Sequence, residues 1–162
     1  MRAIVADKSS IRFDRAVAVP EPAHGEALIR VTHCSVSQED VPTIRHENQF
    51  EGVIGHEFVG IVERVAGEPE HPLVGKRVVG FAVTSCGVCE LCRAGVSAHC
   101  RKRSIMGLSG RGGACAEYCV LPVANLCEIP QSLPDDHAVF SACVGSALHT
   151  VQQVRIAGRP FV

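Results

Sequence analysis

Short runs of apolar and β-branched residues, separated by glycine and proline, make up most of this sequence. The runs that predict strands are residues 3–6, 13–19, 26–34, 58–65, 76–83, 116–121 and 125–129. Residues 37–48 are polar and predict a loop or a short helix. Many short strands interrupted by turn residues are typical of a small, irregular β-barrel or sandwich.

The pattern changes after residue 131. Ser132 is placed as a helix N-cap, with Pro134 early in the first turn and Asp135 reaching back to the cap. Residues 137–156 are apolar and rich in alanine, which predicts one or two buried helices. We therefore expect an α+β chain that is mainly β, with a helical segment over 134–156.

Composition narrows the class of protein. A length of 162 residues suits one domain, and 46% hydrophobic with 20% charged residues indicates a folded globular chain. The net charge of −1 gives no general attraction to nucleic acid or to an anionic membrane, and no apolar run is as long as a membrane span. Nine cysteines without the features of a signal peptide indicate a reducing compartment, so a cytoplasmic location is expected.

The strongest local signal is a cluster of four cysteines, Cys86, Cys89, Cys92 and Cys100, spaced C-x2-C-x2-C-x7-C. Four thiolates from one loop suit a closed tetrahedral zinc site of structural type. An iron–sulfur cluster is the main alternative, but the bacterial ferredoxin run brings its fourth cysteine after three residues and before a proline. Disulfides are a weaker alternative in a chain without a secretory signal. The basic triplet 101–103 is interpreted as a solvated face beside the thiolates, not as a nucleic-acid patch.

The order of these features resembles one family, the zinc-dependent medium-chain alcohol dehydrogenases, in their N-terminal GroES-like catalytic domain. The matching segments are MRAIVAD at the start, residues 19–31, GVIGHEFVGIVERV at 52–65, residues 74–81, the cysteine lobe at 85–103, and GGACAEYCVLP at 112–122. The resemblance implies a barrel-like, zinc-binding domain over residues 1–162. In the family this domain pairs with a Rossmann domain and oxidises alcohols or reduces carbonyls with NAD(P).

The resemblance also implies a catalytic zinc, which acts as a Lewis acid on the substrate oxygen. Its ligands in the family are a cysteine after the third strand, the histidine of the GHE motif, and a cysteine or glutamate near the later helix. His56 matches the histidine, Glu57 the adjacent acid, and Asp40 the aspartate that follows the cysteine. The third ligand position falls on Ala142 or Cys143, of which Cys143 is the plausible ligand.

The sequence departs from the family pattern at the first of these ligands. Ser37 stands where the cysteine belongs, and a hydroxyl is a poor zinc ligand because it stays protonated. Cys34 lies three residues earlier, about 10 Å away on an extended chain and facing the other side. The relay hydroxyl of the family is replaced by Glu39. Three further cysteines, Cys115, Cys119 and Cys127, are expected in the core.

No dinucleotide-binding motif is found. The family's cofactor domain would begin near Arg155, whereas this sequence stops at Val162, and the glycine cluster 107–113 is better explained as a turn. We therefore expect an alcohol-dehydrogenase-like oxidoreductase domain that is inactive alone and uses NAD(P) only from a separate cofactor domain. The alternative is a non-catalytic zinc-binding module. Expected partners are a small alcohol or carbonyl substrate and a Rossmann domain or a second copy, without nucleic acid or membrane.

Overall fold

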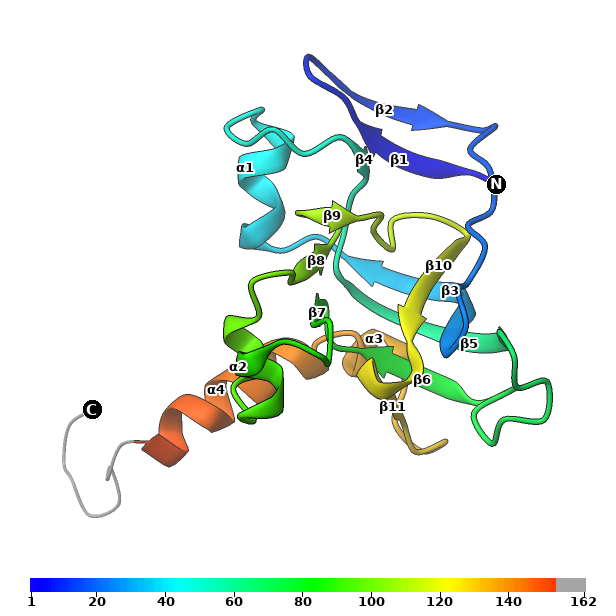
Figure 1. Cartoon of the computed structure of the whole chain (residues 1–162). Helices are drawn as coiled ribbons and strands as arrows, with labels where there is room; N and C mark the ends of the chain where they lie inside the picture. The colour runs from blue at the N-terminus through cyan, green and yellow to red at the C-terminus, as the bar shows by residue number, and fades with distance from the viewer. Residues whose placement is uncertain (154–162) are drawn as a thin grey trace, which may run out of the picture.

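The centre of the molecule is an antiparallel sheet of five strands in the order β10-β3-β5-β6-β11 (Figure 1). Its strands are β3 (Glu26–Ser35), β5 (Glu57–Val65), β6 (Arg77–Gly80), β10 (Tyr118–Pro122) and β11 (Leu126–Glu128). The structure is a computed structural model and describes residues 1–153. The two longest strands, β3 and β5, pair with each other along most of their length, with register shifts beside Ile29 and Thr32.

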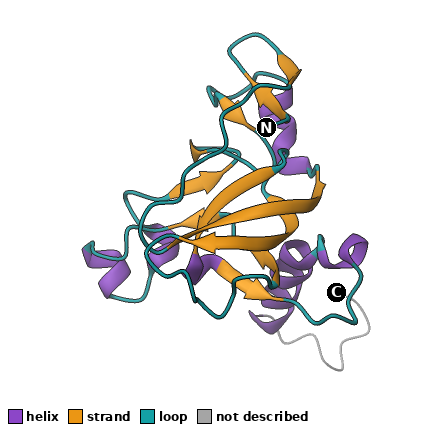
Figure 2. Cartoon of the chain, turned by 90° about the vertical axis from the view of Figure 1, so that its right-hand side faces the viewer, coloured by secondary structure: helices purple, strands orange, loops and turns teal. Residues whose placement is uncertain are grey.

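Two smaller sheets flank this one. The first has the order β2-β1-β4 and contains β1 (Ala3–Ala6), β2 (Ile11–Asp14) and β4 (Gly52–Val53). The second, in the order β7-β8-β9, contains β7 (Val83–Thr84), β8 (Ser104–Met106) and β9 (Gly110–Arg111), of which β8 and β9 run parallel. The three sheets pack together, and the helices lie at the periphery (Figure 2).

The helices are short except for the last. They are α1 (Val41–Ile44), α2 (Glu90–Arg93), α3 (Asp135–Ala138) and α4 (Ser141–Gln153), with 3-10 turns at Gln38–Asp40, Ser97–His99 and Val123–Asn125. Within residues 1–153 no helix has the length and apolarity needed to cross a lipid bilayer.

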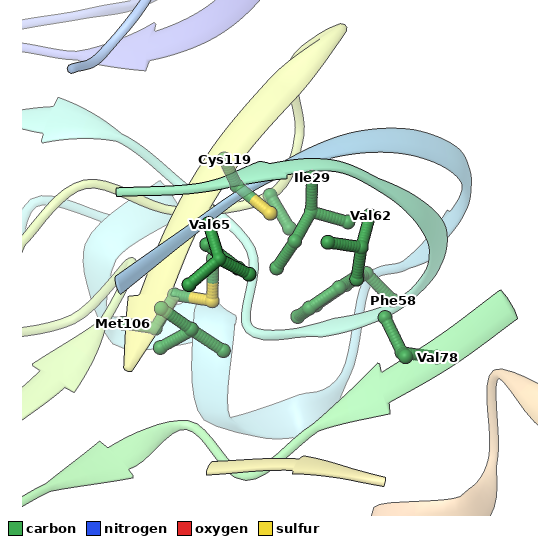
Figure 3. Packing of buried hydrophobic residues seen from close by; sticks show 10 residues of the cluster. Ile29, Phe58, Val62, Val65, Val78, Met106 and Cys119 are labelled. Carbon is green, nitrogen blue, oxygen red and sulfur yellow. The ribbon is translucent and has the colours of Figure 1, made fainter. Parts of the chain in front are cut away.

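The core packs mainly on the central sheet, and Met106 of β8 joins it (Figure 3). Phe58 is its largest fully buried side chain, and it packs with Ile29, Val62 and Val78 from three strands of the same sheet. Removing such side chains from water is the main favourable term in folding, about 1.5–3 kcal/mol for each large apolar residue. The β-branched runs of the sequence therefore form strands because one face of each is buried.

The expected fold class is confirmed: the chain is mainly β, with a four-cysteine lobe and a C-terminal helix. Some boundaries were wrong. The second strand is Ile11–Asp14 instead of 13–19, and the predicted strand 76–83 is divided into β6 and the start of β7. The two-residue strands β4 and β9 and the three-residue β8 were missed, because segments this short carry no detectable periodicity.

The helical segment 134–156 forms two helices, and its last three residues lie outside the described part of the chain. Ser132 is not the N-cap, since α3 begins after Pro134 without a side-chain cap. The carboxylate of Asp135 turns instead to Arg77 and to the Thr32 hydroxyl. The expectation that the helices are buried was wrong for α4, which contains no buried residue and extends away from the sheet (Figure 1).

One backbone crossing depends on glycine. Gly113 N–H donates to Val53 O at 2.6 Å, and a Cβ atom at Gly113 would overlap the carbonyl groups of Ile54 and Gly55. Its neighbour Gly112 has open space around the same position. The pair therefore provides a matched test of how tightly the segment before His56 is held.

We expect Gly113→Ala to destabilise the fold by about 1–3 kcal/mol, because the added methyl group forces two hydrogen-bonded segments apart. Gly112→Ala should leave stability nearly unchanged. Thermal unfolding followed by circular dichroism checks both variants. Equal melting temperatures for the two would show that the crossing is not tightly packed.

Candidate functional site

The four cysteines of the lobe converge as the spacing predicts. Cys86, Cys89, Cys92 and Cys100 bring all four sulfur atoms within 4.8 Å of one another. The separations include 3.4 Å for Cys89–Cys92, 3.6 Å for Cys86–Cys100 and 3.9 Å for Cys89–Cys100. Zn–S bonds of about 2.3 Å in tetrahedral geometry place sulfur atoms about 3.8 Å apart, so the donor set fits zinc.

Local backbone geometry supports negative charge on this cluster. The N–H groups of Cys86 and Lys102 donate to Cys100 Sγ at 3.4 and 3.3 Å. The N–H groups of Val88 and Cys89 donate to Cys86, which lowers the pKa of that thiol to about 6. Burial and the neighbouring thiols raise the pKa of Cys92 to about 11, because in the absence of a cation the four groups cannot all ionise. Metal binding would relieve this repulsion, since a coordinated thiol is deprotonated.

The second group of polar residues centres on His56, which is buried immediately before β5. Its Nδ1 lies 3.1 Å from Asp40 Oδ1, and both side chains are almost fully buried. Asp40 also accepts the backbone N–H of Ser37 at 2.9 Å, so the 3-10 turn at Gln38–Asp40 carries the carboxylate to the ring. Asp40 thereby fixes the orientation of the imidazole, so that Nε2 points away from Asp40.

Two oxygen atoms face that second ring nitrogen. Ser37 Oγ lies 3.4 Å from His56 Nε2, and Glu39 Oε2 lies 3.1 Å from it. Ser37 is also the N-cap of the 3-10 turn, where its Oγ accepts the N–H of Glu39. The interpretation that Ser37 stands in place of a family cysteine stays a prediction of the sequence register. A neutral hydroxyl and an exposed carboxylate thus occupy the space in front of the ring.

Glu57 joins the last helix to this region. Its carboxylate is buried and accepts the Ser35 hydroxyl at 2.6 Å and the Cys143 thiol at 2.9 Å. The contact with Glu57 raises the pKa of Cys143, because a thiolate beside a carboxylate is disfavoured. Cys143, on the first turn of α4, is therefore brought to the residue next to His56 although 86 positions separate it from Glu57.

The described residues 1–153 contain one set of three or more His, Cys, Asp or Glu side chains whose ligand atoms all lie within 4.8 Å, and that set is the cysteine lobe. His56, Glu57, Asp40 and Cys143 are neighbours, but they are arranged as hydrogen-bonded pairs and not as one ligand set. Ser35 was missed by sequence reasoning, since nothing marks a serine at a strand end as a partner of a buried acid.

The remaining cysteines are placed in different surroundings. Cys119 is buried in the core as expected, whereas Cys127 is exposed and Cys115 only half-buried, so the expectation of a core position was wrong for these two. The sulfur of Cys34 lies 3.3 Å from that of Cys115. Sequence spacing could not reveal this contact because the two residues are 81 positions apart.

The electrostatics of His56 lead to a prediction. The hydrogen bond to Asp40 raises its pKa above the usual 6.5, against the effect of burial, and the charges of Asp40, Glu39 and Glu57 act in the same direction. The Asp40 pKa is lowered, because the hydrogen bonds from His56 and the Ser37 N–H outweigh the effect of burial on the carboxylate. Protonated His56 therefore stabilises the folded state fully below pH 6.5, and this contribution is lost as pH rises through the raised folded pKa.

We expect Asp40→Asn to lower the His56 pKa, because burial then acts without the compensating carboxylate. Glu39→Gln should lower it less, since that carboxylate is mostly exposed. NMR titration of the imidazole protons in metal-free protein measures each value. A His56 pKa that is the same in the wild type and in Asp40→Asn would contradict the assignment of Asp40 as its main partner.

Comparison with known proteins places the chain in a family. Residues 23–131 match the family model described as the alcohol dehydrogenase GroES-like domain. L-threonine 3-dehydrogenase of Anaeromyxobacter dehalogenans (strain 2CP-C) is 36% identical over 166 residues, covering 98% of this chain and 48% of the relative. The enzyme of the same name from Deinococcus deserti is 36% identical over 146 residues, covering 86% of this chain and 42% of the relative.

Solved structures agree with this match. An alcohol dehydrogenase from Escherichia coli CFT073, complexed with NADH, has a TM-score of 0.76 and 32% identity, covering 86% of this chain and 41% of that one. A proposed zinc-binding dehydrogenase from Sinorhizobium meliloti 1021, bound to NADP, has a TM-score of 0.85 and 30% identity. The match covers 96% of this chain and 46% of that one. The chain spans about half the length of the relatives it matches. From its fold and its family match, the chain belongs to the medium-chain zinc alcohol dehydrogenase family, as a GroES-like N-terminal domain.

Proposed function

We propose that this chain is the zinc- and substrate-binding half of an NAD(P)-dependent oxidoreductase that acts on a small alcohol or carbonyl compound. The observation that carries the proposal is the buried His56–Asp40 pair, which presents Nε2 to an oxygen-lined space in a domain of this family. A histidine held in this way by a carboxylate is a common arrangement for metal ligands, because the partner fixes the tautomer and raises the basicity of the ring.

The cysteine lobe is proposed to hold a structural zinc. It offers four sulfur donors and no open position, so its metal would contribute to folding instead of to the reaction. The lobe covers residues 85–103 and contains only one buried cysteine, Cys100, so few apolar contacts hold it together. Coordination would supply the stabilisation that this small segment lacks.

A catalytic zinc, when bound, would polarise the substrate oxygen for hydride transfer. In this chain His56 would hold it through Nε2, and Cys143 would be the helix ligand if its thiol turned from Glu57 toward the ring. Ser37 offers only a neutral hydroxyl at the position of the family's cysteine. The carboxylate of Glu39, 3.1 Å from Nε2, is the nearest anionic group that could compensate. The site as built therefore departs from the family in its donors while retaining the histidine and its aspartate.

The exposed apolar side chains of α4 indicate that this helix packs against a partner. Phe140, directly before α4, and Val144, Leu148 and Val151 within it recur at helical spacing, and each is 47–57% exposed. An apolar stripe of this kind on a helix without any buried residue is unfavourable in water. Since the matched relatives are about twice as long, a cofactor domain is the proposed partner of this face.

A non-catalytic zinc-binding module is the second candidate. Ser37 in place of a thiolate ligand favours it, because the metal affinity of the His56 group would then be low. The two functions differ in the number of metal ions that the chain retains.

We expect protein purified without chelator to contain one zinc in the cysteine lobe and a second, weaker one at His56. Elemental analysis of the wild type, His56→Ala and Cys89→Ser separates the sites. His56→Ala should lose only the second zinc, because the lobe lies between β7 and β8 and shares no ligand with the His56 group. Cys89→Ser should lose the lobe zinc and melt at a lower temperature, since coordination energy is folding energy for such a lobe.

One zinc per chain, unchanged in His56→Ala, would contradict the catalytic part of the proposal and support the non-catalytic module. Retention of wild-type zinc content and melting by Cys89→Ser would overturn the structural site. Glu39→Gln serves as the matched test of the compensating carboxylate: it should weaken the second zinc without changing the first.

By itself the 162-residue chain should not bind NAD(P)H at micromolar concentration. The described residues contain no pair of parallel strands linked by a helix, which is the unit that holds a dinucleotide. A fluorescence titration with NADH and NADPH tests this expectation. Saturation at micromolar cofactor would show that the chain carries a dinucleotide site of another kind.

A further inference from the structure

Two cysteines outside the zinc lobe and outside the His56 group lie in contact. Cys34 near the end of β3 and Cys115 just before β10 place their sulfur atoms 3.3 Å apart, and neither side chain is fully buried. Both line a surface hollow together with Phe13, Val36 and Arg2. Phe13 and Val36 are more than half exposed, so a small solute can reach the hollow from solvent.

Backbone hydrogen bonds hold Cys115 against the Ile54–Gly55 segment. Cys115 N–H donates to Ile54 O at 2.8 Å, and Ala114 N–H donates to Gly55 O at 2.9 Å. Gly55 lies directly under the two sulfur atoms: a Cβ atom there would overlap Cys115 Sγ and lie 3.0 Å from Cys34 Sγ. The fold therefore keeps two thiols together that the sequence separates widely.

The two thiols differ in acidity. The hydrogen bond from Cys34 lowers the pKa of Cys115, whereas the pKa of Cys34 is strongly raised, first by this hydrogen bond and then by burial. One thiol thus stabilises the thiolate of the other, an arrangement in which one sulfur reacts and the second resolves the product.

We propose that Cys34 and Cys115 form a reversible dithiol–disulfide pair that is oxidised by hydrogen peroxide or a related small peroxide. A disulfide requires the sulfur atoms to move from 3.3 Å to about 2.05 Å, which small side-chain rotations can supply. Neither residue belongs to a zinc site, so the proposal does not depend on the proposed function.

The chemistry balances with peroxide as the oxidant. The Cys115 thiolate attacks one peroxide oxygen, the O–O bond breaks, and the sulfur becomes a sulfenic acid as the first water leaves. Cys34 then gives up its proton, its sulfur attacks the sulfenic sulfur, and the S–S bond forms as the second water leaves. Two thiols and one hydrogen peroxide yield one disulfide and two waters, with each sulfur oxidised by one electron; an organic peroxide would release its alcohol in place of the first water.

Formation of the disulfide would link the end of β3 to the segment that is hydrogen-bonded to Gly55. Ser37 follows Cys34 by three residues and His56 follows Gly55 directly, so the bond would restrain both strands that carry the His56 group. The apolar wall of Phe13 and Val36 favours a small neutral oxidant such as hydrogen peroxide.

The test is peptide mapping of the full zinc-loaded chain after brief exposure to hydrogen peroxide and alkylation of free thiols. Combined cleavage by trypsin and glutamyl endopeptidase yields residues 31–39 and 112–117, each with a single cysteine. We expect these two peptides to appear as one disulfide-linked species in most chains, and to separate on treatment with dithiothreitol. Oxidation in concentrated urea should reduce the linked species at least severalfold, because the contact exists only in the folded chain.

Cys34→Ser and Cys115→Ser should abolish the linked species, whereas Cys127→Ser, which removes an exposed cysteine elsewhere, should leave it unchanged. If either serine variant fails to fold, the comparison of native and urea-treated wild type decides alone. Separate recovery of alkylated 31–39 and 112–117 after native oxidation, while Cys127 or Cys143 is oxidised, would overturn the proposal. Equal yields of the linked species in native and urea-treated protein would overturn it as well.

Discussion

The close crossing of three backbone segments at Ile54–Gly55 is the constraint on which both the His56 group and the Cys34–Cys115 contact depend. Gly107 and Gly113 both approach this short stretch closely, and a side chain at either position would overlap its peptide groups. Hydrogen bonds from Gly113, Ala114 and Cys115 then fix it in place. Because His56 and Glu57 follow immediately, this packing of the main chain sets where both residues lie, and their hydrogen bonds to Asp40, Ser35 and Cys143 then orient the side chains.

Two groups of reactive side chains lie beside this crossing. On one side Asp40 holds the His56 ring, and Glu57 reaches Ser35 and Cys143, so four separate elements contribute to a connected polar group. On the other side Cys34 and Cys115 meet against Gly55. The register irregularity beside Thr32 is where a strand changes the alternation of its side chains, since a bulge shifts the pattern by one residue.

The cysteine lobe is organised by a different principle. Its four sulfur atoms come from one short loop, and their mutual distances follow from local turns and N–H···S contacts. Such a site needs few long-range contacts and can be recognised from spacing alone. The His56 group needs the whole sheet, because its members come from residues 35 to 143.

Sequence alone determined the fold class, the strands of the central sheet, the family and the cysteine lobe, because each rests on local spacing or on alternation along one strand. That Ser37 takes the place of a family cysteine stays a prediction of the family register. Only the tertiary structure decided that α4 is exposed, that Cys143 contacts Glu57 and that Cys34 contacts Cys115. These contacts join residues more than 80 positions apart, and whether they form depends on how strands cross and where glycine permits close approach. No local pattern in the chain encodes that geometry.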